Sequence, residues 1–141
     1  MPRSIVITEE YAHPPEAVWA LLTQSDQIAR WLMPNDFVPE VNRSFTLRTR
    51  PRPGFDGIVR CRVLELDPPK RMRWSWASGK FDSVVIFELL PTRAGTRLTL
   101  RHEGFRGAAQ LLPWFIMRHG WAKKLKVSLP AAFADPAEET S

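Results

Sequence analysis

The stretch Pro14-Pro15-Glu16-Ala17-Val18-Trp19 decides the fold, because it follows closely on an extended run at residues 4–11. Proline fixes φ near the helical value, and the N–H that it lacks would be unpaired in a first helical turn anyway. Val18, Trp19 and Leu22 fall on one face of the helix that begins there. The stretch therefore predicts a strand that leads into a short amphipathic helix, whose apolar face must lie on another part of the molecule.

A second short helix and five further strands are predicted after this stretch. Ser25 is a suitable N-cap for the second helix, and Pro34 ends it. The inner side of this helix carries Ile28, Trp31 and Leu32. Apolar and β-branched runs bounded by turn residues predict strands at 45–50, 57–67, 71–77, 81–90 and 96–103. Connections this short favour an antiparallel meander.

Arginine dominates the charge of the 141-residue chain, whose formal net charge is +5 at pH 7. Within and beside the expected strands the arginines recur at even spacings, as Arg48, Arg50, Arg60, Arg62, Arg71, Arg73, Arg97 and Arg101. Leu47, Met72 and Trp74 have the opposite parity. Because residues two apart share a face of a strand, the pattern predicts a sheet with an arginine-studded solvent face and an apolar concave face. The basic face is either a solubilising surface or a docking site for an anionic partner.

The apolar period changes near residue 108 and predicts one long helix to about residue 129. Pro113 should lie in the first turn of this helix or kink it, and Pro130 should help to stop it. The final residues are acidic, and we expect them to fray. The predicted organisation is a single domain over 4–130, followed by a flexible acidic C-terminal tail over 131–141.

These elements together predict an α+β fold. A curved antiparallel six-stranded sheet would wrap around the long C-terminal helix, with two short helices after the first strand. The long helix carries Trp114, Phe115 and Trp121, which must be buried against the one sheet available. A curved sheet around a long helix generally leaves a cavity between them, and this cavity is the expected site.

This arrangement resembles the helix-grip fold of the START-like (SRPBCC) superfamily, and within it the branch related to the activator of the heat shock protein 90 ATPase. The resemblance spans roughly residues 4–129. It is carried by Pro14 with Val18 and Trp19, by Trp31, by Asp67-Pro68-Pro69 with Trp74 and Trp76, by Thr96–Phe105, and by Gly120-Trp121 with Leu125. The resemblance implies the fold and leaves the ligand open, because the superfamily includes lipid binders, cyclases and hydroxylase domains.

Inward strand parity and the helix face toward the sheet select the residues expected to line the cavity. They are Trp31, Phe45, Leu47, Val63, Met72, Trp74, Trp76, Phe87, Leu100, His102, Leu112, Phe115, Ile116 and His119. Because this lining is strongly aromatic, it suits a flat hydrophobic or aromatic ligand. The alternative is that most of these side chains pack against one another as core.

No catalytic constellation is visible in the sequence. His102 has inward parity and His119 lies on a flank of the long helix, so both are candidates for an acid–base group, although a histidine in such a place is more often structural. No placed pair of carboxylates, phosphate-binding loop, metal signature or nucleophile motif occurs. The sequence therefore predicts no catalytic residue, no metal and no cofactor, and leaves enzymatic activity unassigned.

Three functions of different classes remain open at this point. The first is binding of a small hydrophobic or aromatic ligand in the cavity. The second is a protein-interaction or chaperone-associated stress-response domain that uses the basic convex face, and the third is a cyclase-like enzyme with His102 as its acid–base group.

The expected partner is a small hydrophobic molecule, with a protein as the second candidate. We do not expect nucleic acid or a membrane span, and both a monomer and a homodimer fit the sequence. The lone Cys61 excludes an internal disulfide and fits a cytoplasmic location.

Overall fold

A computed structural model describes residues 2–53, 55–78, 81–106 and 110–134 of the chain. The six strands form one antiparallel sheet in the order β1-β6-β5-β4-β3-β2, so that the first and last strands pair with each other. The strands are β1 (Pro2–Tyr11), β2 (Ser44–Arg48), β3 (Ile58–Asp67), β4 (Arg71–Ser78), β5 (Phe81–Pro91) and β6 (Thr96–Arg106). The helices are α1 (Pro15–Thr23), α2 (Ser25–Trp31), α3 (Leu111–Lys123), the π-helical turn η2 (Lys124–Ser128) and α4 (Leu129–Ala134).

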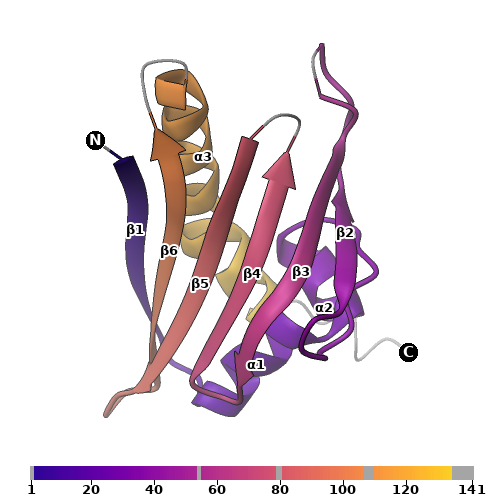
Figure 1. Cartoon of the computed structure of the whole chain (residues 1–141). Coiled ribbons are helices and arrows are strands. Elements are labelled where there is room, and N and C mark those ends of the chain that lie inside the picture. The colour runs from indigo at the N-terminus through magenta and orange to yellow at the C-terminus, as the bar shows by residue number, and fades with distance from the viewer. Residues whose placement is uncertain (1, 54, 79–80, 107–109, 135–141) are drawn as a thin grey trace.

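The helices all cover the same face of the sheet (Figure 1). α3 lies behind β1 and β6, α1 lies at the lower end of the sheet, where it contacts β5, and α2 lies behind β3 and β2. This is the predicted α+β helix-grip architecture, with its six-stranded antiparallel sheet, long C-terminal helix and two short helices after the first strand. No helix within the described ranges is long and apolar enough to cross a membrane.

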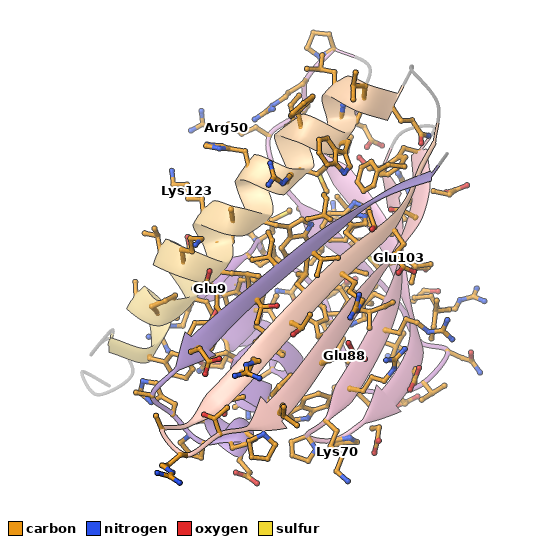
Figure 2. All side chains as sticks on the ribbon, turned by 90° about the vertical axis from the view of Figure 1, so that its left-hand side faces the viewer. Glu9, Arg50, Lys70, Glu88, Glu103 and Lys123 are labelled. Carbon is orange, nitrogen blue, oxygen red and sulfur yellow. The ribbon has the colours of Figure 1, made fainter. Side chains whose placement is uncertain are left out.

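Strand parity places the core as predicted. Met72, Trp74 and Trp76 of β4 are at most 2% exposed, and the residues between them are only partly covered. The arginines of the neighbouring strands project from the outer face, where Glu88 and Glu103 also lie (Figure 2). Alternation with a period of two therefore separates the core from the solvent face across the sheet.

The double proline begins α1 as predicted. Pro14 is the N-cap in an extended conformation, Pro15 is the first helical residue, and the Pro14 carbonyl accepts hydrogen bonds from the N–H groups of Ala17 and Val18 at 3.0 and 3.2 Å. Val18 is completely buried. The N-cap of the second helix was predicted one residue too late, because Gln24 takes that position and Ser25 donates its hydroxyl to the Asn35 carbonyl at 3.1 Å.

The C-terminal helix corrects two predictions. It continues past Pro130 to Ala134, so neither its predicted end near residue 129 nor a tail that begins at 131 is right. Ala132 is buried, and the ring of Phe133 stacks on His13 with centroids 3.9 Å apart. The part of the predicted tail at 135–141 lies outside the described residues.

A π-helical turn explains why Pro130 does not stop the helix. In η2 the Leu129 N–H donates to the Lys124 carbonyl, five residues back. Pro130 would be the next donor in this register, toward the Leu125 carbonyl, but it has no N–H. The Tyr11 hydroxyl donates to that carbonyl instead, at 2.7 Å. The helix therefore passes a proline because strand β1 supplies the missing donor.

Replacing Tyr11 by phenylalanine will cost about 1–3 kcal/mol of unfolding free energy, because the buried Leu125 carbonyl then loses this donor. Burial raises the pKa of Tyr11, so the phenol stays protonated as the donor requires. Urea denaturation measures the loss. The control is Thr8→Val, which removes an exposed hydrogen bond to Thr99 and should change stability by less than about 0.5 kcal/mol. Equal losses in the two variants would contradict this account of Pro130.

Candidate functional site

His102 of β6 is completely buried and both of its ring nitrogens are hydrogen-bonded. The indole N–H of Trp121 donates to Nδ1 at 3.0 Å, and Nε2 lies 2.7 Å from the Ser83 hydroxyl. That hydroxyl lies 3.2 Å from the Trp76 carbonyl, to which it donates. A tryptophan N–H can only donate, so Nδ1 is the acceptor and Nε2 carries the proton. These hydrogen bonds run from the Trp121 indole through His102 and the Ser83 hydroxyl to the Trp76 carbonyl, and each polar atom in the series has a partner. We call this series the histidine network.

The histidine network makes His102 a structural residue. Burial lowers its pKa to about 3, which keeps the ring neutral at pH 7. Its ring neighbours include Trp76, Phe105 and Trp121, which carry no charge. Neither nitrogen is free to exchange a proton with a substrate, so the geometry does not favour the cyclase-like alternative.

The centre between sheet and helix is filled by side chains. The strand residues expected to line a cavity there, together with Trp31, are all at most 2% exposed: Trp31, Phe45, Leu47, Val63, Met72, Trp74, Trp76, Phe87, Leu100 and His102. Trp74 shows how they pack, with ring centroids 5.0 Å from Phe45 and 4.9 Å from Phe87. These side chains are part of the buried interior, and of them only Trp76 also lines the pocket described below.

The helix residues expected to face the cavity turn outward instead. Leu112 is 67% exposed, Phe115 is 53% exposed, and His119 is also exposed. The phase of α3 is set by Trp121, which enters the core, and by Trp114, which donates to the Ser4 carbonyl of β1 at 3.1 Å. The prediction that Phe115 is buried was therefore wrong, because one side of α3 is enough to cover β1 and β6.

A pocket of about 240 Å³ lies beside this core rather than within it. We call it the side pocket. The segment that follows α2, the segment after β2, the adjoining strands and the α3–η2 helix form its walls, through Leu32, Met33, Thr49, Arg52, Phe55, Val59, Trp76, Ser78, Ile116, Met117, Gly120, Trp121 and Lys124. Of the predicted lining residues, only Trp76 and Ile116 are among them. Arg52 and Ile116 are exposed, so the pocket reaches the surface.

Most of the side-pocket residues were missed by sequence reasoning. The Arg-Pro-rich segment at 50–54 supplied none of the predicted lining residues, yet Arg52 and Phe55 pair through a short backbone bridge and form one wall. Gly120 was noted as a family motif, and its function as a lining residue follows from the space beside it. An ideal Cβ placed on Gly120 would have no heavy atom within 4 Å beyond the adjoining residues and backbone of its own helix. A glycine in mid-helix beside large rings is the one signal that pointed to this place.

The side pocket is apolar with two cationic side chains and no carboxylate in its lining. Lys124 is about half-buried in the helix, and burial together with the neighbouring Lys123 lowers its pKa. The indole N–H of Trp76 has no hydrogen-bond partner in the described part of the chain. These features suit a small, mainly apolar ligand, and they provide no side chain positioned for acid–base catalysis.

The basic outer face is largely occupied by internal ion pairs. Glu88 lies between Arg71 and Arg101, with its carboxylate 3.3 Å from the Arg101 guanidinium. Glu65 is 3.1 Å from Arg71 and 3.5 Å from Arg73. Because these arginines are already paired, the geometry gives no specific support to an anionic partner on this face.

A metal or thiol site finds no support either. Within the described ranges, no three His, Cys, Asp or Glu side chains are grouped so that they could hold a metal ion. Cys61 is buried, and burial raises the pKa of its thiol to about 12, so it is a small core residue without thiolate character.

Comparison with known families agrees with the fold. The profile of the family described as "Activator of Hsp90 ATPase homolog 1-like protein" matches residues 12–134. The chain belongs to this family. The match covers every element from α1 to α4, including the histidine network and the side pocket. No curated protein sequence matches this member of the family.

Solved structures show the same architecture. Protein MLL2253 from Mesorhizobium loti is 32% identical, with a TM-score of 0.86 over 94% of this chain and 97% of that one. Protein BH1534 from Bacillus halodurans is 24% identical, with a TM-score of 0.80 over 92% and 96% of the two chains. DynU16, a putative protein in the dynemicin biosynthetic locus, is 16% identical, with a TM-score of 0.78 over 94% of this chain and 47% of its own. The last two likenesses concern the fold alone.

Proposed function

We propose that this protein binds a small, largely apolar molecule in the side pocket, without catalysing a reaction on it. The observation that carries the proposal is a surface-reaching apolar recess of about 240 Å³ beside a core that is otherwise filled. Ligand pockets typically measure about 300–1,000 Å³, and a pocket of about 240 Å³ lies just below that range, so it suits only a small ligand such as a single fused ring system or a short chain. The histidine network is fully satisfied, which argues for binding rather than chemistry.

The comparisons support this proposal in general terms. DynU16, which has the same fold, comes from a biosynthetic locus. A chaperone-associated function has no comparable support in the structure, because Arg71, Arg73 and Arg101 of the outer face are paired with glutamates. The side pocket is therefore the better candidate.

Gly120→Leu will weaken ligand binding at least about tenfold while leaving the fold intact. The new side chain enters open space beside the pocket wall, and leucine is a better helix former than glycine. Native mass spectrometry of the protein from its own host would show a co-purifying molecule, which the variant should lack. Titration calorimetry with 2-naphthoate and with its neutral analogue 2-naphthamide should show at least about tenfold weaker binding to the variant.

The matched control is Gly120→Ala, whose methyl group is too small to fill the pocket and should change either affinity by less than about twofold. If the wild-type protein binds neither probe and carries no co-purifying molecule, the proposed function is wrong. Binding that survives Gly120→Leu unchanged would place the ligand somewhere else, for example on the exposed side of α3.

A further inference from the structure

We infer that the ligand of the side pocket carries an anionic group, such as a carboxylate, which lies between Arg52 and Lys124 while its apolar body contacts Phe55, Met117 and Trp76. This inference rests on the proposed function and names the chemical class of its ligand. The two cations come from segments far apart in the sequence and line one pocket, whose walls hold no acidic residue.

Lys124 has no function that the fold itself explains. α3 continues directly into η2 and α4, so Lys124 lies in mid-helix, where the helix dipole does not stabilise a cation. The residues three and four positions away along the helix are Gly120, Trp121, Val127 and Ser128, none of which is acidic. In contrast, Lys126 of the same turn lies 3.1 Å from the Glu9 carboxylate.

Arg52 is in a similar position on the other wall. The acidic residue nearest in sequence is Asp56, which pairs with Arg60 at 3.1 Å. In the part of the chain that the structure describes, no carboxylate lies within 4.0 Å of the charged nitrogens of Arg52 or Lys124. Figure 2 shows the flanking residues Arg50 and Lys123 on the same side of the molecule, beside the helix and away from Glu88.

The energetics favour an anion at this place. A half-buried ammonium group next to another lysine is held in its charged form at a cost, which is why the pKa of Lys124 is lowered. An anionic ligand would offset both the lost hydration and the repulsion from Lys123. Because the surroundings are partly apolar, a charge pair formed there is stronger than the same pair in water. A neutral ligand of the same shape would gain none of this.

The pair 2-naphthoate and 2-naphthamide tests the inference, because the two molecules have nearly the same shape and differ in charge at pH 7. The wild-type protein should bind the carboxylate about five- to twentyfold more tightly than the amide, as measured by titration calorimetry. Both probes should shift the indole N–H signal of Trp76 in ¹⁵N–¹H correlation spectra. Lys124→Gln and Arg52→Gln should each remove most of the preference and leave amide binding within about twofold.

Lys123→Gln is the matched control, since it changes the net charge equally one residue away but lies outside the lining. It should preserve the preference for the carboxylate, and Lys124→Arg should restore what Lys124→Gln loses. Equal affinity of the wild type for both probes overturns the inference and leaves the proposed function standing. The inference is also overturned if Lys123→Gln reduces the preference for the carboxylate as much as Lys124→Gln does, because that result would indicate long-range attraction only. Binding of neither probe overturns both proposals.

Discussion

Acidification from pH 7 to pH 4.5 will destabilise this protein, and replacing His102 by glutamine will remove most of that dependence on pH. The pKa of His102 falls from 6.5 in the unfolded chain to about 3 in the fold, because burial disfavours the charged ring. The unfolded state therefore binds a proton below pH 6.5 that the folded state does not accept. The stability from neutral His102 is complete above pH 6.5 and is lost progressively as the pH falls toward 3.

The size of this effect follows from proton linkage. The unfolding free energy should fall with a slope of up to about 1.4 kcal/mol per pH unit, which amounts to about 2–3 kcal/mol between pH 7 and pH 4.5. Asp36 and Asp56 have pKa values below 3.8, so they contribute mainly at lower pH. The window between pH 6.5 and pH 4.5 therefore isolates the histidine network.

Urea denaturation at half-unit intervals of pH measures the slope for the wild type and for His102→Gln. The variant will be less stable at pH 7, since its amide cannot reproduce both hydrogen bonds to Ser83 and Trp121. Its slope, rather than its absolute stability, is the readout. His119→Gln is the control, because it removes an imidazole that is exposed on α3. A His102→Gln variant that keeps the full slope would show that another group is responsible.

The same network marks the limit of what the sequence could predict. Parity along β6 is enough to point His102 inward, because side chains alternate across a strand. What the ring meets there depends on β5 and α3, which supply Ser83 and Trp121. The alternation along a strand predicts which way a side chain points, but it does not identify the partner of that side chain. A structural and a catalytic histidine could therefore not be distinguished from the sequence.

The position of the pocket was unpredictable for a related reason. The strand pattern identified the apolar face correctly, but parity cannot tell whether the rings on that face leave space between them. Trp74 and its aromatic neighbours fill the centre. The remaining space lies beside Gly120, where the helix has no side chain, and next to a segment whose conformation is irregular. Both features depend on tertiary packing.

The end of the C-terminal helix shows how a sound local rule can fail. Proline normally stops or kinks a helix because it removes one backbone donor. Here a π-helical turn and the hydroxyl of Tyr11 compensate for Pro130. Tyr11 is far from Pro130 in the sequence, so the residues around Pro130 give no indication of this hydrogen bond.

Gly95→Ala will cost about 3 kcal/mol or more of unfolding free energy, the largest loss that we expect from a single added methyl group. Gly95 lies in the turn between β5 and β6, where it exchanges backbone hydrogen bonds with Thr92 at 2.9 and 3.2 Å. A Cβ there would lie 2.1 Å from the Tyr11 carbonyl oxygen and 2.7 Å from the His13 nitrogen. Both are backbone atoms, one in the last residue of β1 and one just after it, so no side chain can rotate away to make room.

Gly120→Ala makes the same chemical change with the opposite expected sign, which separates the local clash from any general effect of replacing glycine. The methyl group meets no heavy atom within 4 Å beyond the adjoining residues and backbone of its own helix, and alanine in a helix interior is favoured over glycine by about 0.5–1 kcal/mol. Urea denaturation should therefore show a gain for Gly120→Ala, and circular dichroism will detect Gly95→Ala if it does not fold at all. Similar stability of the two variants would mean that the β5–β6 turn can move away from β1. In that case the chain segment that leads from β1 into Pro14 would be held less tightly than its contacts with Gly95 indicate.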